Sequence, residues 1–283
     1  MIVIGGSNFV AVRFSNAELP PFWGATIRFV PAAALFVIAM AIWRVPIPRG
    51  VALVGAVLYG AINFGLGYAT AYFGLQQVNA GTASVILATL PLFTIVLAVA
   101  HGLERFRPRA LVGALIALVG IALIFSDELR ADVAPLYLGA IVLNAAAAAE
   151  AAVIVKRFPR THPVATNAVG MLVGAAMLFG LSLLIGEAHP LPQRVDTQIA
   201  VLYLATVGSV GLFGLILFVI GRWRVSAASY ALVVAPLVAV SLGAVLRGEP
   251  IGFAFVIGAA IVAAGVYIGA LAPSGAGREA EAG

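Results

Sequence analysis

Two ionisable side chains fall inside long apolar stretches, where they could bind a charged partner. Arg28 lies about seven residues into one stretch, and Glu150 lies within another. A charge inside a membrane is costly unless it is paired or hydrated, so each is a functional candidate. Arg28 could hold a substrate carboxylate, and Glu150 could bind a proton or a cationic group. Alternatively, Arg28 extends to the outer surface and Glu150 pairs with Lys156 or Arg157 near the inner one.

One apolar stretch, 50–74, carries small and polar residues along a single side. With 100° of rotation per residue, this stripe comprises Ala52, Ala56, Tyr59, Asn63, Gly67, Thr70, Gly74 and Gln77, and the opposite side carries Val57, Phe64, Tyr68 and Leu75. An apolar helix side in a membrane must face lipid. We therefore expect the second set to face lipid, and Tyr59 and Asn63 to line a cavity. Small residues serve tight helix packing equally well.

Two buried amides and several hydroxyls complete the candidate site. Asn8 and Asn144 need partners in a dry environment, which a cavity or an interhelical hydrogen bond would supply. We predict a binding site near the middle of the membrane, made by Asn8, Tyr59, Asn63, Ser84, Asn144, Tyr203, Ser209 and Ser229.

Other chemistries lack their residues in this sequence. The chain has no cysteine, which excludes disulfides and thiolate metal sites. It has no HExxH zinc motif and no phosphate-binding loop, and its three histidines lie at the edges of apolar stretches. No pair of intramembrane aspartates suggests a protease. We expect no catalytic residue, no metal and no cofactor, and hence no enzyme.

The composition predicts an all-α polytopic membrane protein. Of 283 residues, 63% are hydrophobic and 10% charged, against about half and about a quarter in soluble domains. At about 20 residues per crossing, ten segments emerge: 1–14, 21–43, 50–74, 78–100, 109–126, 134–156, 163–186, 197–220, 226–246 and 250–272. The first is short for a crossing. The polar tail, 273–283, is expected to be disordered and cytoplasmic.

Loop charge predicts the orientation and gives no reason to expect a nucleic-acid partner. With the N-terminus inside, eleven basic residues fall in inside loops and four in outside loops. The inside set is Arg44, Arg49, Arg105, Arg107, Arg109, Lys156, Arg157, Arg160, Arg222, Arg224 and Arg278, and the outside set is Arg13, Arg130, Arg194 and Arg247. This asymmetry predicts ten crossings with both termini cytoplasmic.

The chain repeats itself at an offset of 145 residues. Residues 80–99 read AGTASVILATLPLFTIVLAV, and residues 225–244 read VSAASYALVVAPLVAVSLGA. The match runs on from Glu104 and Glu249 to the paired glycines Gly113, Gly120, Gly258 and Gly265, which should let segments five and ten pack tightly. Five crossings per copy is an odd number, so the copies, 1–127 and 134–272, should form inverted repeats.

Each repeated helix carries a central proline. Pro91 and Pro236 remove a backbone donor, free the carbonyls of Leu87 and Leu232, and bend the helix. Such paired kinks could serve as hinges in a rocking mechanism. The alternative is that they only shape helix packing.

The doubled run of proline, glutamate and two glycines resembles the paired EamA domains of the drug/metabolite transporter superfamily. The segment GGSNFVAVRF at 5–14 and the ATIRF that contains Arg28 resemble the opening of such a domain. The resemblance covers essentially the whole chain. Gly5 departs from it, because a tryptophan typically precedes the Gly-Ser-Asn run.

This resemblance implies a ten-helix carrier of the bacterial inner membrane, often an exporter of amino acids or other small metabolites. Its central cavity would be built from helices one, three, four, six, eight and nine, and the aromatic amino acid exporters are the first branch to consider. We expect a monomer that moves a small-molecule substrate across the bilayer by alternating access. Alternatives are a non-transporting membrane protein, a channel-like facilitator, or a carrier for another metabolite or a drug.

Overall fold

The computed structural model describes residues 2–78, 80–126, 133–237 and 253–271, and these are helical apart from short turns and connections. The elements are α1 (Ile2–Asn16), α2 (Pro21–Ile42), α3 (Val51–Tyr59), η1 (Gly60–Gly67), α4 (Tyr68–Gly74), α5 (Ala80–Leu87), α6 (Leu90–Ala100), α7 (Pro108–Ile124), α8 (Pro135–Arg157), α9 (Pro163–Leu184), α10 (Val195–Ala205), η3 (Thr206–Gly211), α11 (Leu212–Arg222), α12 (Val225–Val233), α14 (Phe253–Val266) and η4 (Tyr267–Leu271). The elements η1, η3 and η4 are π-helical.

Length and composition make the chain a multi-pass membrane protein. Seven described helical runs are long and apolar enough to cross a bilayer, and two shorter apolar helices, Pro108–Ile124 and Val225–Leu237, accompany them. The last two predicted segments reach residues outside the described ranges, as do Glu249 and the tail 273–283. The count of ten crossings therefore stays a prediction.

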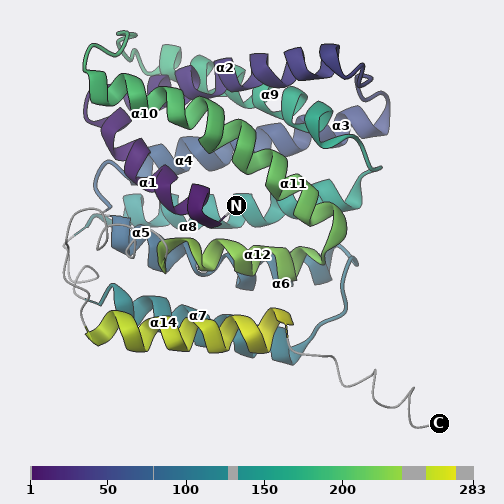
Figure 1. Ribbon diagram of the computed structural model, residues 1–283, viewed down its shortest axis with the longest axis vertical. Helices are drawn as coiled ribbons and strands as arrows, with labels where there is room; N and C mark the ends of the chain where they lie inside the picture. The colour runs from purple at the N-terminus through teal and green to yellow at the C-terminus, as the bar shows by residue number, and fades with distance from the viewer. Residues whose placement is uncertain (1, 79, 127–132, 238–252, 272–283) are drawn as a thin grey trace.

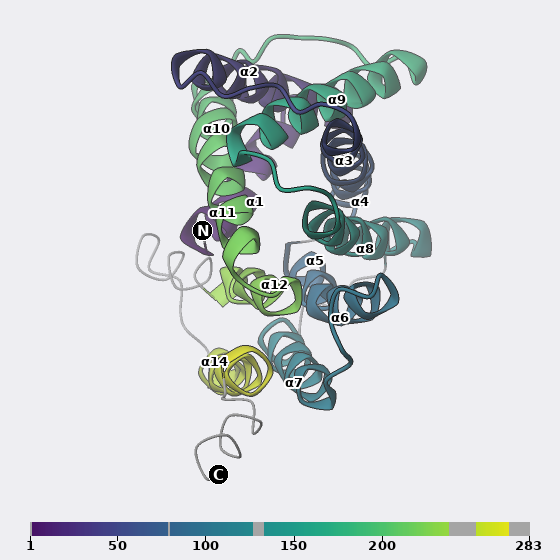
Figure 2. The same ribbon diagram turned by 90° about the vertical axis from the view of Figure 1, so that its right-hand side faces the viewer.

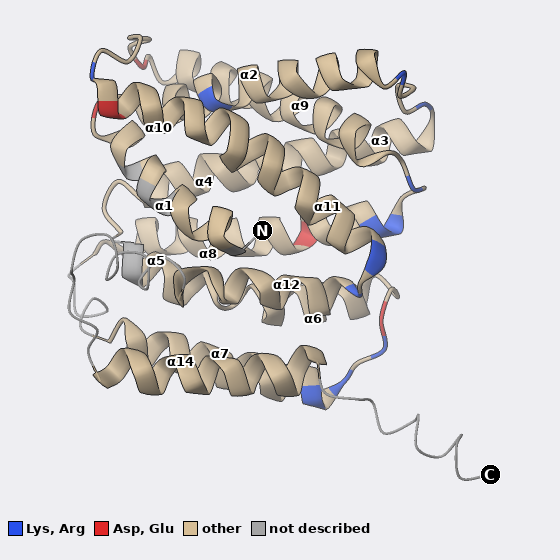
Figure 3. Cartoon of the chain, in the orientation of Figure 1, with Lys and Arg blue, Asp and Glu red and all other residues tan. Residues whose placement is uncertain are grey.

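The helices lie side by side in a bundle whose two extremes are tightly paired (Figures 1 and 2). Helix α2 packs along α9 at one extreme, and α7 packs along α14 at the other. Between them, α6 contacts both α8 and α12, and α1 contacts α10. The loops that carry most of the Lys and Arg residues gather at one end of the bundle (Figure 3).

Glycines allow the α7–α14 pair to touch backbone to backbone. A Cβ added at Gly265 would lie 2.5 Å from the Ala117 nitrogen and 2.6 Å from the Gly113 oxygen. One added at Gly120 would lie 2.7 Å from the Gly258 oxygen. The expectation that these repeated glycines bring segments five and ten close together is confirmed.

Two membrane-spanning runs contain a π-helix near the middle. The first is η1, between α3 and α4, and the second is η3, between α10 and α11. Adding the offset of 145 to Gly60–Gly67 gives 205–212, which brackets Thr206–Gly211. The two copies of the repeat thus share this uncommon feature.

The helices also break just before both central prolines. Helix α5 ends at Leu87 and α6 begins at Leu90, while α12 ends at Val233 and a turn follows at 234. The predicted bends at Pro91 and Pro236 correspond to these breaks, which lie one to four residues before each proline. Their movement as hinges stays a prediction.

The predicted lipid-facing side of residues 50–74 is wrong beyond Val57. Val57 is exposed as expected, but Phe64 is fully buried, and Tyr68 and Leu75 are partly buried. The cause is η1, because hydrogen bonds from i to i+5 place about one residue more in each turn than an α-helix does. Residues after the π-helix are thereby rotated away from the face that a 100° step assigns to them.

The glycine contacts yield a stability prediction. Gly265→Val should destabilise the protein by about 1–3 kcal/mol, because the added methyl groups meet the α7 backbone and force the pair apart. Gly139→Val on α8 is the matched control, since a Cβ there meets nothing within 4 Å. Thermal unfolding of the two purified variants measures the difference, and equal midpoints would contradict the packing described here.

Candidate functional site

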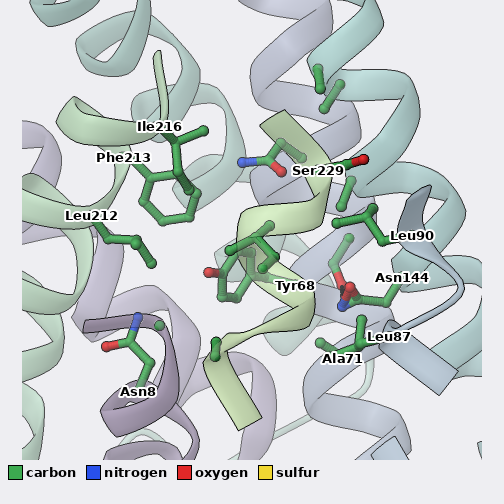
Figure 4. Close-up of a pocket in the computed structure, with 18 of the residues that line it drawn as sticks. Asn8, Tyr68, Ala71, Leu87, Leu90, Asn144, Leu212, Phe213, Ile216 and Ser229 are labelled. Atoms are coloured by element: carbon green, nitrogen blue, oxygen red, sulfur yellow. Dashed lines mark hydrogen bonds between the residues drawn. The ribbon is translucent and has the colours of Figure 1, made fainter. Parts of the chain in front are cut away.

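A cavity of about 230 Å³ lies in the middle of the bundle (Figure 4). Its wall is formed by α1, the α3–η1–α4 run, α5, α6, α8, α11 and α12, with Arg28 contributed by α2. In the numbering of the ten predicted segments, these helices are one, three, four, six, eight and nine, as the resemblance implied. Arg28 adds one residue from segment two. The volume is below the roughly 300–1,000 Å³ of pockets for drug-sized ligands, so it suits a smaller solute.

Most of the predicted site residues meet at this cavity. Six of the eight line it: Asn8, Tyr59, Asn63, Ser84, Asn144 and Ser229. Arg28 and Pro236 line it as well, whereas Glu150 and Pro91 do not. The convergence is a finding about placement, and substrate binding by these residues stays a prediction.

The structure places Tyr203 and Ser209 outside the cavity wall, and their part in substrate binding stays a prediction. The Tyr203 hydroxyl pairs with Ser7 Oγ at 2.5 Å, on the contact between α10 and α1. Ser209 is fully buried, and its hydroxyl accepts a hydrogen bond from Arg28 Nε. Both hydroxyls are thus used in contacts between helices.

Arg28 is buried, with an exposed fraction of 1%. Its Nε donates to Ser209 Oγ at 2.9 Å, and its Nη2 donates to the Gly208 carbonyl at 3.0 Å. Its Cζ lies 5.0 Å from the ring centroids of both Phe29 and Tyr68, within reach of a cation–π interaction. The alternative in which Arg28 extends to the outer surface is therefore wrong.

No carboxylate balances the Arg28 charge in the described part of the chain. The ion pairs found there join His101 to Glu150 and Arg194 to Asp196. Arg28 is instead held by a hydroxyl, a backbone carbonyl and two aromatic rings. It is a positive charge at the cavity wall, of the kind that pairs with a carboxylate.

Two asparagines tie the π-helices to their neighbours. Asn8 Nδ2 donates to the Gly208 carbonyl of η3 at 2.9 Å, and Asn144 Nδ2 donates to the Gly67 carbonyl of η1 at 3.2 Å. Each amide thus makes an interhelical hydrogen bond and also lines the cavity, so both readings of these residues hold. The Gly208 carbonyl accepts from Asn8 and Arg28 together.

Three polar atoms of cavity residues are buried without a hydrogen-bond partner: Asn8 Oδ1, Asn63 Nδ2 and the Tyr72 hydroxyl. Nearly all buried polar groups in proteins are satisfied. Asn63 Nδ2 and the Tyr72 hydroxyl are both able to donate to a bound solute. Apolar side chains make up most of the remaining wall, with Leu87, Leu90 and Ile216 among them.

The sequence did not reveal Tyr68, Tyr72 or Phe213 as cavity residues. Tyr68 stands edge-on to Phe29 with centroids 4.6 Å apart, and its centroid lies 6.2 Å from that of Phe213. Figure 4 shows Tyr68 and Phe213 lining the same cavity as Asn8 and Asn144. The sequence feature that could have revealed them is the concentration of tyrosines after Gly67. An α-helical register placed Tyr68 on the side expected to face lipid, so this feature was not used.

Glu150 sits away from the cavity in a separate contact. Its Oε1 lies 3.3 Å from His101 Nε2, and its Oε2 is buried without a partner. The proposed pairing with Lys156 or Arg157 is wrong, because Lys156 Nζ donates to the carbonyls of Ile220 and Trp223 and Arg157 Nη1 donates to the carbonyl of His101.

At each end of the bundle, a carboxylate accepts hydrogen bonds from the first turn of a helix. At one end, Glu104 accepts hydrogen bonds from the Ser226 nitrogen at 3.1 Å and from its hydroxyl at 2.5 Å, at the start of α12. At the other, Glu187 accepts from the backbone nitrogens of Phe22 and Trp23 at the start of α2. Both arrangements satisfy N–H groups that a helix leaves open at its first turn.

Comparison with known proteins gives a consistent result. The model of the EamA-like transporter family matches residues 1–126 and 136–270. A Salmonella typhimurium protein named probable amino-acid metabolite efflux pump is 26% identical, over 95% of this chain and 91% of its own length. An Escherichia coli protein named uncharacterized inner membrane transporter YedA is 28% identical, over 88% of this chain and 81% of its own.

A solved crystal structure shares the fold. It superposes with a TM-score of 0.78 at 20% identity and covers 95% of this chain and 94% of its own. At that identity the likeness concerns the fold alone.

Cysteine labelling can test the cavity wall, because the chain has no cysteine of its own. Tyr68→Cys should react with a membrane-impermeant thiol reagent, since the reactive thiolate forms only where water reaches it. Val57→Cys, on the lipid-facing side of α3, should stay unmodified. The readout is the mass of the labelled protein. Modification of Val57→Cys but not of Tyr68→Cys would contradict the placement of Tyr68 at the cavity wall and would indicate an unbroken α-helix in this segment.

Proposed function

The chain belongs to the EamA-like transporter family of the drug/metabolite transporter superfamily, and from this premise we propose that it exports amino acids or similar small metabolites by alternating access. The observation that carries the proposal is a central cavity of about 230 Å³ with a buried arginine, amides and aromatic rings on an otherwise apolar wall. Similarity to proteins named probable amino-acid metabolite efflux pumps supports the substrate class. Aromatic amino acids are the first substrates to test. Membership of a transporter family agrees with the expectation of a non-enzymatic protein.

The proposed architecture is ten crossings in two inverted repeats, 1–127 and 134–272. The π-helices η1 and η3 lie at matching offsets, and both repeated helices break before a proline, which supports the repeat. The gathering of Lys and Arg at one end supports a cytoplasmic position for that end and for both termini. Similarity to a bacterial inner membrane transporter supports the same membrane for this chain. We propose that it works there as a monomer.

The proposed mechanism uses the broken helices. The breaks before Pro91 and Pro236 lie in helices that line the cavity, so a change of bend there would widen one end of the cavity and narrow the other. A bound solute drives this change only to the extent that it binds the two states differently. In this scheme Arg28 receives the carboxylate of the solute.

Transport by the purified protein in proteoliposomes is the first test of this function. Uptake of one class of labelled amino acid should saturate with concentration. Asn63→Ala and Tyr59→Ala should slow it by about tenfold or more, because both side chains line the cavity. Val57→Ala, which faces lipid, is the control and should transport normally. Uptake that never saturates would indicate a channel, and no uptake of any panel member would contradict the proposal.

Proton coupling is proposed for Glu150, in the contact with His101 between α8 and the end of α6. Glu150→Gln should abolish the dependence of transport on pH while leaving substrate exchange intact, because the amide cannot carry a proton across the cycle. Both are measured in the same proteoliposomes with and without a proton gradient. Unchanged pH dependence in this variant would exclude Glu150 as the coupling group.

A further inference from the structure

The described side chains that line the cavity include one fixed charge and none of opposite sign. Among the described residues that line it, Arg28 is the one that is ionised at neutral pH, and none is Asp, Glu, Lys or His. Glu150 stays outside the wall and contacts His101. The site therefore carries a net positive charge that its own described side chains leave unbalanced.

The positive charge of Arg28 should make the cavity bind solutes of different net charge with different affinity. A carboxylate beside Arg28 neutralises a charge that is otherwise buried without a counter-ion, which is an unfavourable situation in a low-dielectric interior. A free ammonium group on the same solute would add a second positive charge within a few bond lengths of the guanidinium, with neutral groups as its sole described partners. Electrostatics thus favours a monoanion over a zwitterion.

The unpartnered polar atoms point the same way. Asn63 Nδ2 is a donor and the Tyr72 hydroxyl can donate, and both are buried without partners at the cavity. Donors of this kind match oxygen acceptors on a solute, such as the carbonyl of an acyl group. The unpartnered acceptor, Asn8 Oδ1, lies against Gly208 of η3. The apolar surfaces of Leu87, Leu90 and Phe213 remain for a hydrocarbon or aromatic side chain.

We propose that the cargo is bound as a monoanionic carboxylate without a free ammonium group, as in an amino acid whose nitrogen is acylated. This rests on the proposed function and narrows its substrate class. Arg28 holds the carboxylate, Asn63 and Tyr72 donate to the remaining oxygen, and the side chain lies on the apolar wall.

The test compares three ligands that share one skeleton. Phenylalanine, N-acetylphenylalanine and phenylalanine amide, and the same three forms of leucine, are titrated calorimetrically into the full-length protein. The N-acetyl form should bind at least about tenfold more tightly than the parent amino acid, and the amide should not bind. Parent amino acids that bind as tightly as their N-acetyl forms would overturn the proposal.

Variants of Arg28 show whether that residue makes the distinction. Arg28→Lys keeps the charge and should retain the order of affinities at reduced strength, because the bidentate fork is lost. Arg28→Gln should bind the N-acetyl and amide forms equally, and a retained preference for the anion would overturn the proposal. Arg194→Gln, at an exposed arginine paired with Asp196, is the matched control and should bind like the parent. Unfolding midpoints establish that each variant is folded.

Transport separates this inference from the function beneath it. Saturable uptake of amino acids without preference for the N-acetyl form would overturn the inference and leave the exporter in place. Absence of saturable uptake of both forms would overturn the exporter itself.

Discussion

The structure depends on one constraint, that every backbone polar group in a membrane must be satisfied within the protein. The π-helices η1 and η3 interrupt the regular α-helical pattern, and side chains from other helices supply donors to their carbonyls. Gly67 receives the amide of Asn144, while Gly208 receives both the amide of Asn8 and the guanidinium of Arg28. The same three side chains therefore satisfy the backbone carbonyls and form part of the cavity wall.

Close packing at the two extremes of the bundle complements this opening at its centre. The α7–α14 pair meets through glycines with no space for a side chain between them, and α2 lies along α9 at the opposite extreme. The helices between these pairs carry η1, η3, the breaks before proline and most of the cavity wall. Under the proposed mechanism, the tightly packed pairs hold the halves together while the broken helices change shape. Such a division is mechanically reasonable, because a glycine contact of this kind tolerates little displacement.

The sequence revealed what periodicity and self-similarity encode. Apolar length located the helices, the 145-residue offset located the broken helices and the packing glycines, and the need of buried amides for partners selected Asn8 and Asn144. The errors have one main source. A π-helix leaves no clear mark in the amino-acid sequence, yet it rotates the residues that follow it about the helix axis. For this reason Tyr68 and Tyr72 were missed as cavity residues. Tyr203 and Ser209 lie outside the cavity wall, and the sequence did not reveal this because a hydroxyl satisfied by a neighbouring helix looks the same in sequence as one that faces a cavity.

Helices α2 and α9 are alike in length and start but differ in charge. Helices α2 and α9 each begin with proline and run for 22 residues, and aligning them from those prolines sets Gly170 against Arg28. In α9 that position packs closely on Gly60 and Tyr59, whereas in α2 it holds the cavity's cation. One half therefore uses the position for packing and the other for electrostatics. A symmetric cavity would offer a solute two equivalent poses, but under the proposed binding mode a single arginine determines which side receives the carboxylate. In that proposed pose the apolar part of the solute points away from η3 toward the broken helices, so the size of that part would affect how the helices bend.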